Sequence, residues 1–245
     1  MATPTVVLVH GAFAESASWN DVIRHLYQNE VTSVAVANPL RSVTIDAAYL
    51  RDVLDSIPGP IVLVGHSYGG FVITEAGSHP SVEALVYVGA FAPDHGENAF
   101  ELSTKFPGSS LGEALDAHPV STGGNEFVIR RDAFHHQFAA DVPVQVAGLM
   151  GATQRPVTEA ALTEPLPTET PAWRARPTWF VYGDEDLNIP AELQRFQTAR
   201  AGARVVRELP GASHAISVSQ PVEVAEVILE AVATVRAADR GAAVA

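Results

Sequence analysis

Ser67 lies at the centre of the segment that carries the most chemical information. It stands in Gly65-His66-Ser67-Tyr68-Gly69, directly after the apolar run from 61 to 64. A strand that turns sharply into a helix at this pattern presents the serine hydroxyl above the sheet, and the flanking glycines avoid collisions in the turn. The pattern therefore predicts a nucleophilic serine, with the N–H of Tyr68 at the helix start as a donor to an oxyanion.

A serine nucleophile needs a base, and the base needs an acid that orients it. His214 is the candidate base, because it follows the predicted strand 205–208 in a loop at the same sheet edge as Ser67. Asp186 is the favoured acid, in the loop after the predicted strand 178–182. Asp184 in that loop and Asp94 after an earlier strand are the alternatives. The order serine, acid, histidine along the chain fits a parallel sheet with its site at the strand ends.

A second oxyanion donor is expected from the loop after the first strand. His10-Gly11-Ala12 follows the run from 5 to 9, and Gly11 allows the backbone to bend so that the Ala12 N–H joins that of Tyr68. Apolar candidates for the substrate pocket are Phe13, Phe91, Phe138, Leu149, Met150 and Trp173.

Short β-branched runs alternate with amphipathic segments along the chain, which predicts an α/β fold with a mostly parallel sheet and helices on both faces. Six strands are expected, at 5–9, 32–36, 60–64, 84–89, 178–182 and 205–208. The alternation stops over 93–176, so this segment is expected to be an insertion after the fourth strand that forms a lid over the site. The whole chain, 1–245, is expected to be one domain.

Together these segments resemble the α/β-hydrolase superfamily. Val7 to Ala12, Gly65 to Gly70, the Asp186 loop and the His214 loop carry the resemblance across nearly the whole chain. Within the superfamily, the chain resembles the branch of plant methylesterases, hydroxynitrile lyases and their bacterial relatives. The resemblance implies a serine hydrolase that cleaves a small carboxylic ester or lactone through an acyl-enzyme, with no cofactor.

Two positions separate the chain from the lyases of that branch. The lyases carry a threonine in the first loop and a lysine directly after the histidine, where this chain has Gly11 and Ala215. Since these groups would stabilise departing cyanide, their absence disfavours cyanohydrin cleavage and favours ester hydrolysis. Two other functions remain open: a sensing protein with slow turnover, and perhydrolase or cofactor-independent oxygen chemistry.

The composition of the chain limits which binding partners are expected. Asp and Glu number 28 against 15 Lys and Arg, giving a net charge of −13, which would repel nucleic acid and anionic membranes. The chain has no cysteine, and the His135-His136 pair lacks carboxylates at ligand spacing, so no metal site is expected. The start of the chain lacks a signal peptide pattern, and no apolar run is long enough for an anchor, so a cytoplasmic location is expected.

Overall fold

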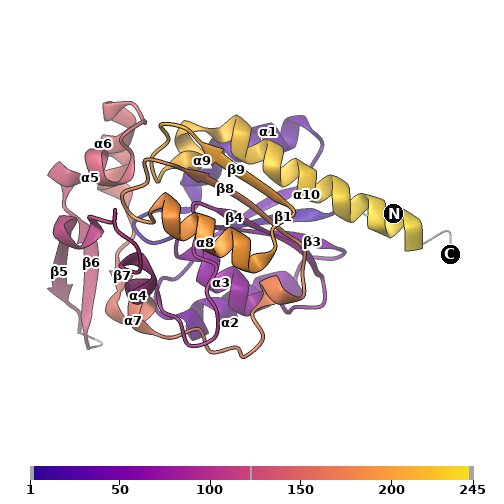
Figure 1. Cartoon of the computed structure of the whole chain (residues 1–245), viewed down its shortest axis with the longest axis horizontal. Coiled ribbons are helices and arrows are strands. Elements are labelled where there is room, and N and C mark those ends of the chain that lie inside the picture. The colour runs from indigo at the N-terminus through magenta and orange to yellow at the C-terminus, as the bar shows by residue number, and fades with distance from the viewer. Residues whose placement is uncertain (1–2, 122, 243–245) are drawn as a thin grey trace.

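A six-stranded parallel sheet forms the centre of the computed structural model, which describes residues 3–121 and 123–242 (Figure 1). Its order is β2-β1-β3-β4-β8-β9, and every neighbouring pair is parallel. The strands are β1 (Thr5–Val9), β2 (Ser33–Val36), β3 (Ile61–His66), β4 (Val82–Val88), β8 (Thr178–Gly183) and β9 (Val205–Leu209). The predicted fold is confirmed: the first expected strand has the observed bounds, and the other five differ from theirs by at most two residues at either end.

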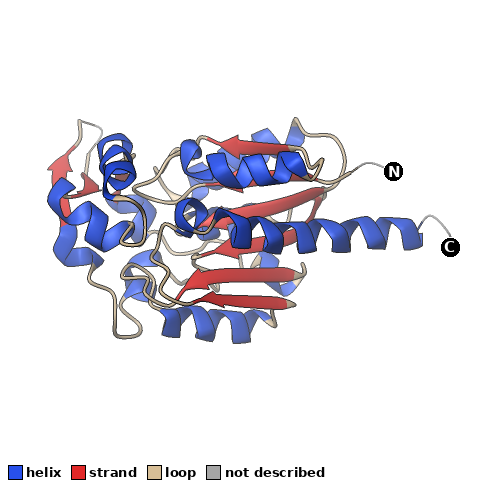
Figure 2. Cartoon of the chain, turned by 90° about the horizontal axis from the view of Figure 1, so that it is seen from above, coloured by secondary structure: helices blue, strands red, loops and turns tan. Residues whose placement is uncertain are grey.

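Helices cover both faces of the sheet, because alternate strand residues point to opposite sides and both sets are apolar. Val6 and Leu8 of β1 pack in one buried cluster, and Val7 and Val9 pack in the other. One face is covered by η1 (Ser16–Trp19), α1 (Asn20–Gln28), α9 (Ile216–Ser219) and α10 (Pro221–Ala242). The other face is covered by α2 (Val43–Asp55), α3 (Gly69–Ala76) and α8 (Ala191–Ala201) (Figure 1), and in Figure 2 the long helix that leads to the C-terminus, α10, lies over the strands of the sheet.

The strand order places the loops that matter for the site next to one another. The chain leaves β1 toward β2 on one side and returns to β3 on the other, which makes the β1/β3 pair the switch point of the sheet. Val9 is paired with Gly65, so the loop after β1 and the turn after β3 start side by side. Parallel strands bring the loops after β8 and β9 to the same edge.

Between β4 and β8 the chain builds a second, smaller structure beyond the carboxyl ends of the strands (Figure 1). Its three antiparallel strands, which the sequence reasoning did not predict, are β5 (Leu115–Pro119), β6 (Asn125–Ile129) and β7 (Val157–Thr158). Its helices are α4 (Ala99–Ser103), η2 (Leu111–Ala114), α5 (Arg131–Phe138), α6 (Val144–Thr153) and α7 (Glu159–Thr163), and the short η3 (Ala172–Arg174) then packs against the end of α3 as the chain returns to the start of β8.

This insertion packs against the core. Leu40 accepts a hydrogen bond from the N–H of Thr158 at 3.2 Å, and Arg41 pairs with Glu126 of β6. Phe134 and Phe138 of α5 belong to the same buried cluster as one face of the main sheet. The insertion is therefore held in place over the strand ends.

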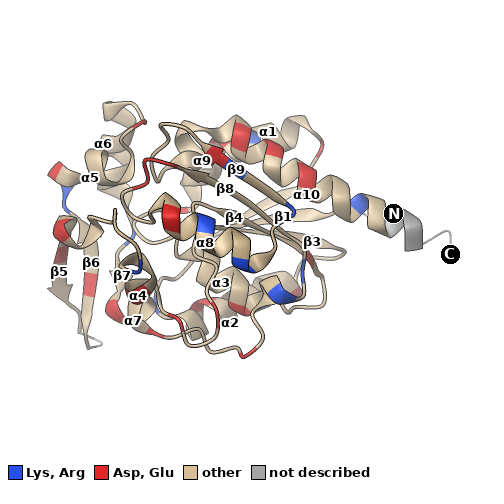
Figure 3. Cartoon of the chain, in the orientation of Figure 1, with Lys and Arg blue, Asp and Glu red and all other residues tan. Residues whose placement is uncertain are grey.

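Charged residues lie mainly on helices and loops in the view of Figure 3, and the acidic ones are spread over several elements. The strands of the main sheet are largely uncharged there, as burial on both faces requires. Among the helices of the described residues, none has the length and apolar character needed to cross a bilayer.

Candidate active site

Ser67 occupies a strained turn between β3 and α3. Its φ angle is +54°, in the left-handed region that costs free energy for any residue with a Cβ. The turn is closed by the Ser67 carbonyl, which accepts from the N–H groups of Gly70 at 3.0 Å and Phe91 at 3.2 Å. A Cβ on Gly70 would lie 1.9 Å from the Phe91 carbonyl oxygen, so only glycine fits there. The local sequence thus holds Ser67, which is buried, in the tight bend between strand and helix that its motif predicts.

The structure brings His214 and Asp186 together. The Nδ1 atom of His214 lies 2.6 Å from Oδ2 of Asp186, and both side chains are buried. The other carboxylate oxygen, Oδ1, accepts the N–H groups of Asn188 at 2.7 Å and Ile189 at 2.9 Å, which fixes the acid in its loop. With Nδ1 donating to the acid, Nε2 of His214 is the ring nitrogen left for another partner, and among the described residues no hydrogen bond joins it to Ser67.

The two alternative acids lie elsewhere. Oδ1 of Asp184 accepts the N–H of Gly211 at 2.6 Å in an exposed turn. Asp94 pairs with Arg174, whose guanidinium holds the pKa of that carboxyl below its usual value. Of the three candidates, Asp186 is therefore the one in contact with His214.

Two aromatic rings hold the His214 ring from other sides. The ring of Phe138 meets it edge-on, with centroids 4.9 Å apart. Nε2 of His66 lies 3.0 Å from the His214 carbonyl oxygen. Burial drives the pKa of His66 well below its ordinary value, so this ring is neutral and donates its Nε2–H to that carbonyl. The base is thus fixed through both its ring and its backbone.

The loop after β1 is pinned by His10. Nδ1 of His10 lies 2.9 Å from the Gly11 carbonyl oxygen, and Nε2 accepts the N–H of Asn38 at 3.1 Å. Burial lowers the pKa of His10 to about 4, so the ring is neutral and can make both bonds at once. Over residues 3–121 and 123–242, neither the Ala12 N–H nor the Tyr68 N–H donates to a protein acceptor. Both predicted oxyanion donors are therefore uncommitted.

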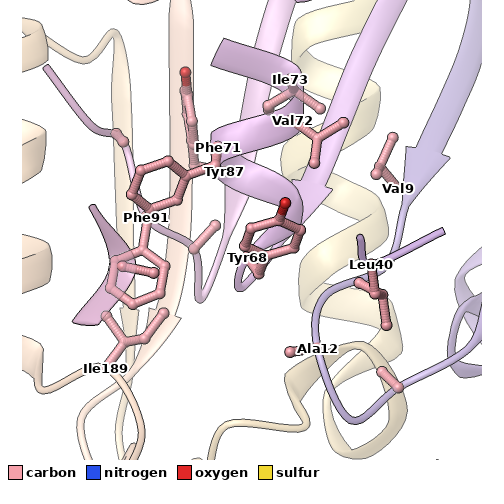
Figure 4. Packing of buried hydrophobic residues seen from close by; sticks show 14 of the residues in the cluster. Val9, Ala12, Leu40, Tyr68, Phe71, Val72, Ile73, Tyr87, Phe91 and Ile189 are labelled. Carbon is pink, nitrogen blue, oxygen red and sulfur yellow. The ribbon is translucent and has the colours of Figure 1, made fainter. Parts of the chain in front are cut away.

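Tyr68 has a second contact that the sequence did not suggest. Its hydroxyl donates to Oδ2 of Asp46 on α2 at 2.9 Å, and that carboxylate also accepts the N–H of Arg41. Burial raises the pKa of Tyr68 well above its ordinary value, so the phenol remains a neutral donor. In Figure 4 the Tyr68 ring lies between Phe91 and Ile189 on one side and Ala12 on the other. The side chain of the residue after the serine is thereby held both by its hydroxyl and by the packing of its ring.

A cavity of about 260 Å³ has both Ser67 and His214 in its wall. Its lining is mainly apolar and comes from the core loops and the insertion. The insertion contributes Ala99, Phe100, Ser103, Thr104, Ser109, Ser110, Leu111, Gly112, Glu113, Leu115 and Leu162. The core contributes Ala12, Phe13, Tyr68, Phe91, Asn188 and Ile189.

Two of the six expected pocket residues, Phe13 and Phe91, line this cavity. The other four are placed elsewhere. Phe138 is buried beneath His214, and the indole N–H of Trp173 donates to the Pro93 carbonyl at 2.7 Å. Leu149 and Met150 line a separate groove of about 460 Å³. The insertion residues of the true lining were missed because its short, mixed segments carry no periodicity that assigns side chains to one face.

No group of three or more metal-ligating side chains occurs in the part of the chain that the structure describes. His135, one of the pair considered above, directs Nε2 to the Val142 carbonyl oxygen at 2.9 Å. The His135 ring therefore contacts the backbone of the insertion itself.

Comparison with known proteins decides the family. Residues 6–227 match the family described as "Alpha/beta hydrolase family", which is most of the chain. The chain belongs to this family. The prediction made from the four loops is thereby confirmed.

Individual proteins are similar to this chain in sequence or in structure. The carbendazim hydrolyzing esterase of Nocardioides sp. (strain SG-4G) is 33% identical over 136 residues, 46% of this chain and 56% of that protein, so the match spans little more than half of the relative. Polyneuridine aldehyde esterase is similar in structure, with a TM-score of 0.79, 22% identity and coverage of 94% and 99% of the two chains. A methylesterase from Arabidopsis gives a TM-score of 0.78 at 17% identity, covering 94% and 99%. These two structures show that the fold is shared with the expected branch.

Proposed function

We propose that this α/β hydrolase is an esterase that cleaves small carboxylic esters or lactones, with Ser67 as nucleophile, His214 as base and Asp186 as orienting acid. The observation that carries the proposal is the 2.6 Å contact between His214 and Asp186 beside a cavity that Ser67 and His214 both line. A buried acid, a base and a strained serine at one sheet edge are what acyl transfer requires.

In the first step, Ser67 Oγ attacks the ester carbonyl carbon while Nε2 of His214 takes the hydroxyl proton. The carbonyl π electrons move to oxygen, and the N–H groups of Ala12 and Tyr68 donate to that oxyanion. Asp186 accepts the Nδ1–H of His214, which favours the imidazolium once it forms. When the tetrahedral intermediate collapses, His214 returns the proton to the departing alcohol and an acyl-enzyme remains.

In the second step, water replaces the alcohol. His214 takes a proton from water as its oxygen attacks the acyl carbon, and the Ser67 oxygen then leaves and regains a proton. The carboxylate product is an anion in a molecule whose net charge is −13, so the long-range field favours its release.

Cavity size and lining support a small substrate. About 260 Å³ falls below the roughly 300–1,000 Å³ typical of pockets for drug-sized ligands. Aromatic and aliphatic side chains such as Phe91, Phe100 and Leu162 favour an apolar acyl group. The relative from Nocardioides is named an esterase, which agrees with this reaction class.

We assign the role of lid to the insertion 93–176, since it supplies about half of the cavity wall, and α5 and the loop after it contact the loops of both the acid and the base. Gln137 donates to the Leu187 carbonyl at 2.9 Å beside the acid, and Ser213 next to the base hydrogen-bonds Asp141. A lid of this kind keeps bulk water from the reacting carbonyl.

The test is hydrolysis of 4-nitrophenyl acetate and butanoate by the wild-type protein, Ser67→Ala and Ser78→Ala. Ser78 is exposed just after α3 and serves as the matched control. The proposal expects Ser67→Ala to lose turnover by up to about a million-fold and Ser78→Ala to match the wild type. Equal rates for wild type and Ser67→Ala would contradict it.

A further inference from the structure

Gln137 belongs to α5 of the insertion, but its buried side chain is bonded to the loop that carries the proposed acid. Nε2 of Gln137 donates to the Leu187 carbonyl at 2.9 Å and to Oδ1 of Asn188 at 2.7 Å. Oε1 accepts the Ser110 hydroxyl at 2.8 Å. Both polar atoms of this amide are therefore paired, and its nitrogen is bonded to the loop after β8.

The orientation of the Gln137 amide follows from its partners. A backbone carbonyl can only accept, so the Gln137 atom beside Leu187 must be the nitrogen. The remaining oxygen then faces the Ser110 hydroxyl, which can donate to it. A side chain of similar length without an amide would lose all of these bonds at once.

A second segment of the insertion holds the same loop. The N–H of Ser110 donates to the Leu187 carbonyl at 3.0 Å, and the Ser109 hydroxyl donates to the Asn188 carbonyl at 3.1 Å. We call Ser109, Ser110 and Gln137 the acid clamp. The acid clamp thus bonds two successive carbonyls of the loop and one of its side chains.

The loop held by the acid clamp is the one that fixes Asp186. The N–H groups of Asn188 and Ile189 donate to Oδ1 of Asp186, and Oδ2 lies 2.6 Å from Nδ1 of His214. A displacement of Leu187 or Asn188 therefore moves the donors that orient the carboxylate. Since a displacement of about 1 Å can cost about 100-fold in rate, the acid clamp bears on the reaction as well as on stability.

We propose that Gln137 is a positioning residue for the reaction, which keeps the Asp186 carboxylate in line with the His214 ring by fixing the loop 186–189. Gln137 does not line the cavity, so it acts through the acid and not on the substrate. This inference rests on the proposed esterase function. It adds that the insertion belongs to the catalytic apparatus as well as covering the site.

The experiment is a double-mutant cycle between Gln137→Met and Asp186→Asn, with kcat and KM measured on 4-nitrophenyl acetate. Methionine is close to glutamine in length and makes none of the amide's bonds. Gln137→Met should lower kcat about 10-fold with KM within about twofold of the wild type. In the Asp186→Asn background the same substitution should cost less than about twofold, because the carboxylate that it positions is already absent. Equal losses in the two backgrounds would overturn the inference.

The matched control is Gln154→Met. Gln154 also lies in the insertion, and its amide also bonds backbone groups: Oε1 accepts the Ile129 N–H, and Nε2 donates to the carbonyls of Ile129 and Gly151. These bonds join the end of α6 to β6 and do not involve the loop of the acid. Turnover in Gln154→Met should stay within about twofold of the wild type. A loss as large as that of Gln137→Met would show a general effect of loosening the insertion and would overturn the inference.

Proton NMR without substrate separates this inference from the esterase proposal. A proton held between a histidine Nδ1 and a carboxylate gives a far-downfield resonance, which reports the contact whatever the turnover. The resonance should move upfield in Gln137→Met and stay in place in Gln154→Met. An unmoved resonance in Gln137→Met refutes the inference and leaves Ser67-dependent hydrolysis standing. If Gln137→Met does not fold, Ser110→Ala removes the hydroxyl donor to Oε1: a smaller upfield shift supports the inference, and no shift overturns it.

Discussion

Gly11 lies so close to Ser67 that a Cβ built on it would come within 2.5 Å of the Ser67 Cβ and 3.1 Å of Oγ. The loop after β1 and the turn after β3 therefore approach to a distance that only glycine allows.

Gly11→Ala should lower kcat by about 100-fold or more, because the added methyl group displaces either the nucleophile or the Ala12 N–H. Gly148→Ala is the control, since an added Cβ on this exposed residue of α6 meets nothing within 4 Å. Steady-state hydrolysis of a short 4-nitrophenyl ester measures both. Wild-type turnover in Gly11→Ala would mean that the loop is not held against the serine during the reaction.

Asp186→Asn should reduce kcat by about 10,000-fold with KM little changed. Asparagine keeps an acceptor for the Asn188 and Ile189 N–H groups, and this places its NH2 against Nδ1 of His214, which favours the wrong tautomer of the base. Asp184→Asn, in the same loop but bonded to Gly211, should stay within about twofold of the wild type. Comparable losses in the two variants would argue against Asp186 as the orienting acid.

His10 makes stability depend on pH. Its pKa is about 4 in the folded state and about 6.5 in the unfolded chain, so acidification protonates the unfolded chain first. The stability that the neutral His10 contributes is fully present above pH 6.5 and is lost as the pH falls toward 4. The free energy of unfolding falls by up to about 3 kcal/mol over this range. Urea unfolding at pH 7 and pH 4 measures this.

In His10→Gln the side chain does not titrate, so the loss of stability between those two pH values should be smaller than in the wild type. The exposed His136 provides the control, and His136→Gln should lose as much as the wild type. An equal loss in His10→Gln and wild type would contradict the buried neutral state of His10. His66 also has a depressed pKa, so its protonation lowers stability at acid pH as well. Because His66 is present in all three proteins, its effect cancels when their losses of stability are compared.

The main sheet and the catalytic loops could be predicted because their physical signals are local. A strand buried on both faces is an apolar run, and the turn at Ser67 needs glycines at fixed offsets. Asp186 and His214 could be placed because parallel strands bring their loops to one edge. These features depend on the order of elements rather than on particular side-chain packing.

The insertion could not be predicted in the same way. Its strands are short and half exposed, and β6 pairs with its hairpin neighbour β5 and with β7, which lies about 30 residues further along the chain. The cavity lining depends on that packing, so Leu149 and Met150 were expected there and Phe100 and Leu162 were missed.

The most direct test of the central claim is labelling of the wild-type protein and His214→Ala with a fluorophosphonate, followed by peptide mass spectrometry. The account predicts one stoichiometric adduct on Ser67 in the wild type and labelling at least about 1,000-fold slower in His214→Ala. An adduct on a different residue, or equal labelling rates in the two proteins, would contradict it.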